Sequence, residues 1–304
     1  MSRLSVIITT KNNRETIEEC IKRVLKAPPE DKEVIVVYGK STDGTEEIIR
    51  KFDGKVKIIR DDNSTGSAIN TGILNSKGEI IAYVEGHSFI SNDFFLTLLK
   101  VFDENPDVGY VRLYRYVPKD LKIFNPVQKL INFWRLLLKG SGMGQFRGIR
   151  RKTFFDVGGF WVFPNGWEEV DFVAKMSETR WKSLIVHSKC WDYPRAHILS
   201  VLKKFRRSGG SCSCYFHKYY SHPWSRKEFG AKTPLGMLFN ILVKRFLYAP
   251  IYALKKAISN RYLSFFPFYT VCEWSFALGF MIAKHKWWGK ERWDNRIGRF
   301  GGMM

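Results

Sequence analysis

Two short apolar runs near the start of the chain decide its fold: LSVIITT at residues 4–10 and EVIVVY at residues 33–38. Both are rich in β-branched residues, and an apolar run of this length is typical of a strand buried on both faces. Between them, residues 16–25 carry apolar side chains at helical spacing. The order strand, helix, strand predicts a parallel strand pair joined by a right-handed crossover.

The same unit repeats further along the chain. Helices are expected over residues 46–52 and 68–76, and strands over residues 56–59 and 80–84. This alternation predicts an α/β protein with a mostly parallel, Rossmann-like sheet flanked by helices. Beyond residue 91 the pattern is mixed, and we expect a helix over 93–105, a strand over 108–116, a helix over 126–138, a helix starting at Glu168 and a strand over 182–186.

The chain has 304 residues, which suits one large α/β domain and an appendage. The last 110 residues carry 20 Lys and Arg but only four Asp and Glu, so this part needs an anionic partner. We therefore expect a catalytic domain over residues 1–215 and a basic, aromatic C-terminal region over residues 216–304.

Two apolar stretches occupy residues 235–254 and 262–283 of this region. The second is long enough to span a bilayer, but a single span would place the basic residues 284–299 on the far side, against the positive-inside tendency. Amphipathic helices that lie in the membrane plane or re-enter it are favoured. The five cysteines lack a framework spacing and the start has no signal-peptide core, so the cytoplasmic face of a membrane is expected.

Glu85 and His87 flank Gly86 directly after the apolar run at residues 80–84. Side chains two apart point to the same side, and a carboxylate with a neutral imidazole suits Mn²⁺ or a similar divalent ion. Gly86 would let a diphosphate approach the backbone. The alternative is an ordinary strand-ending turn with an exposed Glu and His.

Three further groups of polar residues are candidates for the site. The loop at residues 41–45 follows the second strand, where ligands of such sheets bind, although Ser, Asp and Gly also form ordinary turns and helix caps. Glu168, Glu169 and Asp171 crowd a helix start, which favours a general base but also suits the helix dipole. Arg195 and His197 could clamp a diphosphate or simply begin the basic membrane-facing surface.

In their order along residues 3–215, these segments resemble the family-2 inverting glycosyltransferases of GT-A fold. The resemblance rests on SVIITTKN at residues 5–12, VVYGKSTDGT at 36–45, GSAINTG at 66–72, KGEII at 77–81, GGF at 158–160 and EEVDF at 168–172. It implies transfer of a sugar from a nucleotide-diphosphate sugar, GDP-mannose or a UDP-sugar, to a membrane-linked acceptor such as a polyprenyl- or dolichyl-linked glycan or phosphate.

The resemblance also implies roles for individual residues. His87 and Glu85 would hold Mn²⁺ or Mg²⁺, with Asp192 or His197 as a third ligand. Glu169 would act as the base, with Asp171 and Glu168 as alternatives. The donor would be bound by Thr9, Thr10, Lys11, Asn12, Ser41, Asp43, Ser67, Asn70, Glu85, Gly86 and Arg195.

The chain departs from the family pattern at three places. Tyr38 and Gly39 replace paired aspartates, so the nucleotide base cannot be inferred. The metal motif has Glu and His in place of two aspartates, and Glu169 replaces the aspartate of the acidic pair. These changes leave an inactive relative as an alternative. A nucleic-acid binder is a weaker alternative, because long apolar runs accompany the basic residues and no zinc-finger, RNA-recognition or helix-turn-helix signature is present.

Overall fold

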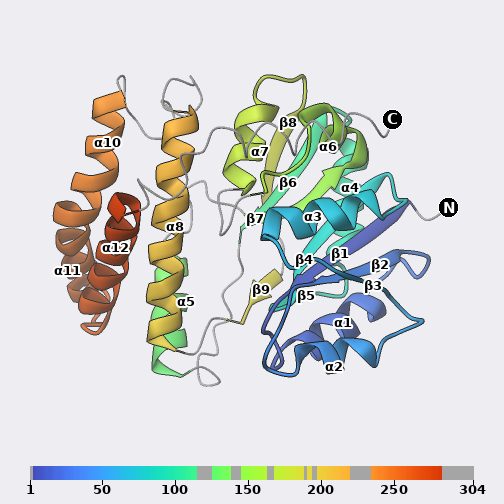
Figure 1. Cartoon of the computed structure of the whole chain (residues 1–304), viewed down its shortest axis with the longest axis horizontal. Helices are drawn as coiled ribbons and strands as arrows, with labels where there is room; N and C mark the ends of the chain where they lie inside the picture. The colour runs from blue at the N-terminus through green and yellow to red at the C-terminus, as the bar shows by residue number, and fades with distance from the viewer. Residues whose placement is uncertain are drawn as a thin grey trace. The chain divides into compact units, whose positions relative to one another are not determined.

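The computed structural model describes residues 3–114, 125–137, 145–162, 168–187, 190–193, 197–219 and 234–282 (Figure 1). The chain forms two compact units. The sheet unit comprises Met1–Pro118, Lys139–Pro164 and Glu168–Tyr193, and the helical unit comprises Lys119–Leu138, Asn165–Trp167 and Pro194–Met304. The division differs from the expected boundary at residue 215, because one continuous helix runs through that position. The assignment of catalysis to residues 1–215 stays a prediction.

A seven-stranded mixed sheet forms the centre of the sheet unit, in the order β3-β2-β1-β4-β7-β6-β8. β1 pairs in parallel with β2 and β4, and β2 pairs in parallel with β3. β7 is antiparallel to both β4 and β6, while β6 and β8 are parallel. The predicted, mostly parallel α/β sheet is therefore confirmed. The strands are β1 (Leu4–Thr10), β2 (Glu33–Tyr38), β3 (Lys57–Arg60), β4 (Ile80–Glu85), β6 (Val108–Tyr114), β7 (Gln145–Arg150) and β8 (Lys182–His187).

Helices cover both faces of this sheet, because alternate side chains of the strands point to opposite faces. Val6 and Ile8 of β1 lie in one core with apolar residues of the helices α1 (Ile17–Lys26), α2 (Thr45–Arg50) and α4 (Phe94–Glu104). Ile7 lies on the other face, where Gly72 of α3 (Thr65–Leu74) contacts it closely. Two further helices of the sheet unit are α6 (Arg151–Val157) and α7 (Glu168–Met176).

A small antiparallel sheet lies beside the carboxyl end of β4. It pairs β5 (Ser88–Ile90) with β9 (Cys190–Asp192), and Ser88 is opposite Asp192. Only two residues, Gly86 and His87, separate β4 from β5 along the chain. The small sheet therefore brings the segment Cys190–Asp192 to the end of β4.

In its described residues, the helical unit contains α5 (Pro126–Leu137), α8 (Ile198–Tyr219), α10 (Pro234–Val243), the π-helical turn η1 (Lys244–Tyr248), α11 (Ala249–Ser259) and α12 (Phe265–Ile282). A core of apolar residues from α5, α8, α11 and α12 holds it together. α8 and α12 cross with their backbones in contact at two glycines. A Cβ atom on Gly209 would lie 1.9 Å from the carbonyl oxygen of Phe276, and one on Gly279 would lie 1.8 Å from that of Arg206.

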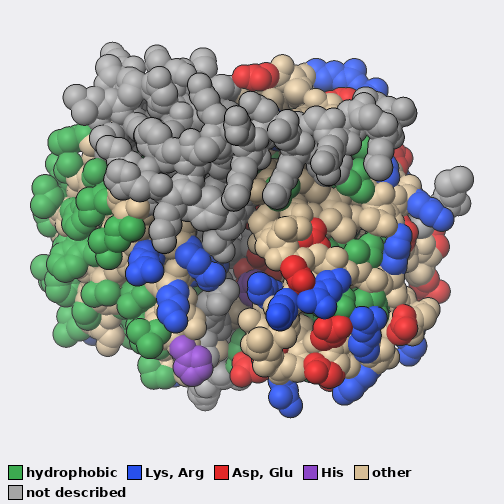
Figure 2. Space-filling view, viewed as in Figure 1, with side chains coloured by type: hydrophobic (Ala, Val, Ile, Leu, Met, Phe, Trp, Pro, Cys, Tyr) green, Lys and Arg blue, Asp and Glu red, His purple; other side chains and the backbone are tan. Residues whose placement is uncertain are grey.

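Two helical faces of this unit leave large apolar side chains exposed. On η1 and α11 the stripe is Leu247, Ile251, Leu254 and Ile258, and on α12 it is Val271, Trp274, Leu278 and Met281. Figure 2 shows hydrophobic side chains gathered over this unit and mixed charges over the sheet unit. Within the described residues, α12 is the one helix long and apolar enough to cross a membrane, and half of it is buried, so this is weak evidence for a span.

Candidate active site

The carboxyl end of β4 presents Glu85 and His87, as the sequence predicted. Both side chains are partly exposed, and His87 Nε2 lies 4.0 Å from Glu85 Oε2. Gly86 is required here for a reason that the sequence did not reveal. A Cβ atom on Gly86 would lie 2.5 Å from Oγ1 of Thr10, so the glycine permits close packing of β1 against this turn.

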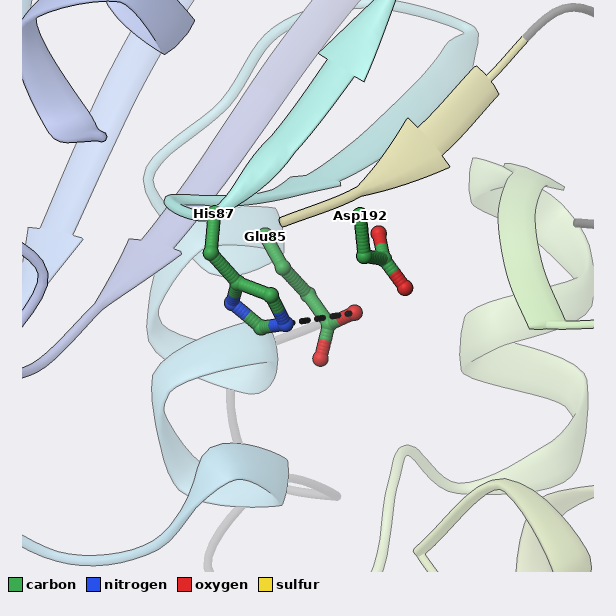
Figure 3. Close-up of side chains that lie close together, drawn as sticks. All are labelled: Glu85, His87 and Asp192. Atoms are coloured by element: carbon green, nitrogen blue, oxygen red, sulfur yellow. Dashed lines mark ion pairs between the residues drawn. The ribbon is translucent and has the colours of Figure 1, made fainter. Parts of the chain in front are cut away.

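Asp192 completes a cluster with Glu85 and His87. One ligand atom from each of the three lies within 4.8 Å of the others (Figure 3). Glu85 ends β4, His87 follows it, and Asp192 ends β9, and Figure 3 shows the three side chains pointing toward a common space. Of the two residues expected as a third ligand, Asp192 is the one found in this cluster. His197 belongs to the helical unit.

The cluster fits a divalent cation. Two carboxylates and an imidazole are a suitable ligand set for Mn²⁺, and carboxylates suit Mg²⁺. At a metal–ligand distance of about 2.1 Å, opposite ligands of an octahedral ion are about 4 Å apart, close to the spread of these atoms. Glu85 and His87 are partly exposed, so a ligand could still reach the ion.

A buried arginine lies behind the cluster. Arg147 of β7 is 1% exposed, and its Nη2 lies 3.3 Å from Asp192 Oδ1 and 3.8 Å from Glu85 Oε2. It also donates to the Ser88 hydroxyl at 3.3 Å, and that hydroxyl donates to Asp192. Neither Arg147 nor Ser88 was predicted from the sequence, because no local motif marks a single arginine within QFRGIR as a neighbour of residue 85.

The three acidic residues of α7 have different surroundings. Asp171 is fully buried and pairs with Lys175 at 3.0 Å, and the same ammonium group donates to the carbonyl oxygen of Gly159. Glu168 is also buried. Glu169 is half-buried, which makes it the most accessible carboxylate of the three.

Tyr83 is a buried residue of β4, two positions before Glu85. Its hydroxyl shares a hydrogen bond of 2.8 Å with Thr9 Oγ1. Burial raises the pKa of Tyr83 well above its ordinary value, and the charges of Glu85, Glu168 and Glu169 raise it further. The charges of these three carboxylates thus all act on one buried hydroxyl.

The loops after β1 and β2 are tied to each other. The backbone N–H of Asn12 donates to Ser41 Oγ at 3.1 Å, and Asn12 Oδ1 accepts from the backbone N–H of Thr42 at 2.9 Å. Asp43 accepts from the backbone of Arg14 and from Thr45. Asn12 has a left-handed backbone with φ of 53°. These residues shape the loops through their hydrogen bonds.

The other predicted donor-binding residues of this edge differ in exposure. Thr9 and Thr10 are buried, and Thr10 Oγ1 accepts from Asn13 at 2.9 Å. Lys11 is exposed. Thr9 and Thr10 thus support the loop, while the Lys11 side chain is open to solvent.

Two more of the predicted donor-binding residues, Ser67 and Asn70, lie in α3. The Ser67 hydroxyl donates to Asp61 at 2.8 Å, and Thr71 donates to the same carboxylate at 2.7 Å. Asn70 is buried and bonds to the backbone of Phe160. Arg195, the predicted diphosphate clamp, lies outside the described residues.

Comparison with known proteins agrees with this fold. The family described as Glycosyl transferase family 2 matches residues 5–170, more than half of the chain. The fold and the match define a glycosyltransferase, and the chain belongs to glycosyl transferase family 2. The resemblance in the sequence is thereby confirmed.

Curated relatives match over part of their length. The chain is 30% identical over 123 residues to glycosyltransferase GlyG of Streptococcus pneumoniae serotype 4, covering 38% of this chain and 41% of the relative. It is 40% identical over 90 residues to glycosyltransferase AglE of Haloferax volcanii, covering 27% and 30%. The chain thus spans less than half the length of these relatives.

Among solved structures, the chain resembles the mannosyltransferase PcManGT from Pyrobaculum calidifontis, solved in complex with GDP-Man and Mn²⁺. The TM-score is 0.60 at 18% identity, and the match covers 92% of this chain and 85% of the other. Residues 1–349 of TarS from S. aureus, in complex with UDP, match with a TM-score of 0.53 at 14% identity, covering 93% and 90%. At these identities the likeness establishes the GT-A-like fold alone.

Proposed function

We propose that this chain is an inverting glycosyltransferase that moves a sugar from a nucleotide-diphosphate sugar to a membrane-linked acceptor, with Mn²⁺ or Mg²⁺ as cofactor. The observation that carries the proposal is the cluster of Glu85, His87 and Asp192 at the carboxyl end of β4 in a family-2 fold. Ligands of open α/β sheets bind at this edge. The relatives in complex with GDP-Man and with UDP support GDP-mannose or a UDP-sugar as donor.

In this proposal Glu85 and His87 hold the divalent cation, with Asp192 as the third ligand. When bound, the cation offsets the negative charge that develops on the departing nucleoside diphosphate. The exposed Lys11 adds a positive charge beside the donor. The Asn12–Ser41 contacts fix the loops against which the nucleoside would lie.

Glu169 is the proposed general base. Its carboxylate takes the proton from the acceptor hydroxyl as the hydroxyl oxygen bonds to the anomeric carbon. The bond from that carbon to the diphosphate oxygen breaks on the opposite side, so the configuration inverts and the electron pair leaves with the diphosphate. Asp171 suits this role less well, because it is buried and paired with Lys175. Glu168 is less accessible than Glu169.

The proposed acceptor is linked to a lipid, such as a polyprenyl or dolichyl phosphate or glycan, at the cytoplasmic face of a membrane. The exposed apolar stripes of η1–α11 and α12 support this part of the proposal, since solvated apolar faces of this extent are unusual in a soluble monomer. The basic C-terminal third would attract anionic lipids.

One ion pair makes the helical unit suited to an apolar environment. Glu273, the acidic residue of α12, is 4% exposed and pairs with Arg245 of η1. The Arg245 guanidinium also lies 3.6 Å from the centre of the Phe276 ring. Arg245, which interrupts the apolar stretch of residues 235–254, is thus neutralised within the unit.

A transfer assay tests the proposal. Purified protein would be offered UDP- and GDP-sugars with Mn²⁺, with polyprenyl phosphate or a lipid-linked glycan as acceptor. We expect one donor to be used and the anomeric configuration of the product to be inverted. No transfer and no binding with any of these donors would instead identify an inactive relative.

The variant Glu169→Gln separates the two acceptor types. For a hydroxyl acceptor, loss of the base should lower kcat by roughly 100-fold or more while donor affinity is retained. For a phosphate acceptor, which is already ionised, kcat should fall only modestly. Glu178→Gln, at an exposed glutamate just after the same helix, is the matched control and should leave kcat unchanged.

A further inference from the structure

Arg147 occupies an irregular position in β7. The pairing of β6 with β7 passes from Val111 opposite Gly148 to Arg112 opposite Phe146 and leaves Arg147 without an opposite residue. This shift of one residue is a β-bulge, and bulges next to active sites re-aim side chains. Here the bulge lies in an interior strand of the sheet, between β4 and β6.

The side chain at this bulge reaches two carboxylates of the proposed metal site. Its Nη2 is 3.3 Å from Asp192 and 3.8 Å from Glu85, and Ser88 bridges it to Asp192. The Arg147 side chain is 2% exposed and that of Asp192 is fully buried. Arg147 therefore acts on these carboxylates from inside the protein, while Glu85 and His87 are partly open to solvent.

The charges of this group nearly balance without a metal ion. Glu85 and Asp192 carry two negative charges, and Arg147 offsets one of them. A divalent cation bound alone would create a net positive charge in a partly buried site, which is unfavourable. The charge of a nucleoside diphosphate would remove that penalty.

We propose that Arg147 is a positioning residue that serves as a built-in counter-cation for Asp192 and Glu85. It holds the two carboxylates in place, and it keeps the affinity for a divalent cation low until the diphosphate of the donor arrives. This inference rests on the proposed function, because it assumes that the cluster binds a metal ion. It explains why a fully buried arginine lies beside a cluster of metal-binding type.

The test is thermal unfolding with Mn²⁺ alone, without nucleotide, on wild type, Arg147→Lys and Arg147→Met. Arg147→Met leaves the carboxylates without their counter-cation, so its Tm should be lower and Mn²⁺ should replace the missing charge. We expect Mn²⁺ to raise the Tm of this variant by roughly 5 °C or more beyond its effect on wild type. Arg147→Lys keeps the charge and should respond to Mn²⁺ as wild type does.

Equal responses of wild type and Arg147→Met to Mn²⁺ would overturn the inference. Arg150→Lys is the matched control, since Arg150 lies in the same strand but donates to the carbonyl oxygens of Val108 and Phe102. Its Mn²⁺ response should equal that of wild type. If the Mn²⁺ response of Arg150→Lys also changed, the effect would come from β7 in general, which would contradict a special role for Arg147.

A second variant covers the case in which Arg147→Met does not fold. In Arg147→Met/Asp192→Asn both buried charges are removed, so folding should be restored and the Mn²⁺ response should be small. A double variant that folds no better than Arg147→Met would overturn the inference. Wild type tested with Mn²⁺ plus UDP or GDP separates the two proposals: lack of any stabilisation there refutes the proposed function, whereas the response of Arg147→Met to Mn²⁺ alone does not depend on nucleotide binding.

Discussion

Asn70 of α3 and Phe160 of the GGF segment are joined by two hydrogen bonds. The Asn70 side chain donates to the carbonyl oxygen of Phe160 at 2.8 Å and accepts from its backbone N–H at 2.9 Å. A residue predicted to bind the donor thus satisfies the backbone of a loop 90 residues away in the sequence. Phe160 in turn stacks on Phe172 of α7, with ring centres 4.4 Å apart, so this contact helps to place the acidic helix.

Asn70→Asp should destabilise the sheet unit. The aspartate keeps the acceptor but loses the donor, and it places a negative charge beside the Phe160 carbonyl oxygen in a buried site. We expect a loss of about 1–3 kcal/mol in the free energy of unfolding, measured by urea denaturation. Asn75→Asp, at an exposed position just after the same helix, is the control and should change little. Equal stability of Asn70→Asp and wild type would show that the two hydrogen bonds do not hold the loop.

The alternation of strands and helices over residues 4–85 could be predicted because each element has a local signal. β7 could not, since its pairing with β4 and β6 joins segments far apart in the sequence and QFRGIR has no uninterrupted apolar run. β9 is only three residues long. Asp192 was one of the two residues expected as a third ligand, but its pairing with Arg147, which depends on these two strands, emerged only from the three-dimensional structure.

Two glycines, Gly86 and Gly209, also make tertiary contacts that the sequence does not reveal. The packing of Gly86 against Thr10 was not predicted, and the expected approach of a diphosphate to the Gly86 backbone stays a prediction. α8 continues through Gly209 and Gly210 although glycine is a poor helix former. The reason is a tertiary contact with α12 at Gly209, which sequence spacing does not reveal.

Gly279→Ala should disrupt the helical unit. The added Cβ would overlap the carbonyl oxygen of Arg206, and backbone cannot move aside as a flexible side chain can. We expect a loss of about 1–3 kcal/mol or more in the free energy of unfolding of this unit, followed by circular dichroism during thermal unfolding. The neighbouring variant Leu278→Ala, at an exposed position, should have a small effect. Comparable losses in both variants would argue against the glycine crossing.

The exposed stripe on η1 and α11 should bind anionic lipid vesicles. Ile251→Gln/Ile258→Gln removes two side chains that are 65% and 61% exposed. At about 1.5 kcal/mol or more per side chain, vesicle binding should weaken roughly a hundredfold in a flotation assay. Leu96→Gln, at an exposed leucine of α4 in the sheet unit, is the control and should bind as wild type does. Unchanged binding of the double variant would remove this stripe from the membrane contact.

Calorimetric titration of UDP and GDP, in Mn²⁺ and in chelator, is the most direct test of the proposed site at Glu85 and His87. With Mn²⁺, wild type should bind one of the two nucleotides, and chelator should abolish that binding. His87→Ala and Glu85→Gln should each weaken Mn²⁺-dependent binding by about tenfold or more, whereas Glu30→Gln, at an exposed glutamate, should not. Binding that is equally tight in chelator and in His87→Ala would contradict a metal-dependent nucleotide site at the end of β4.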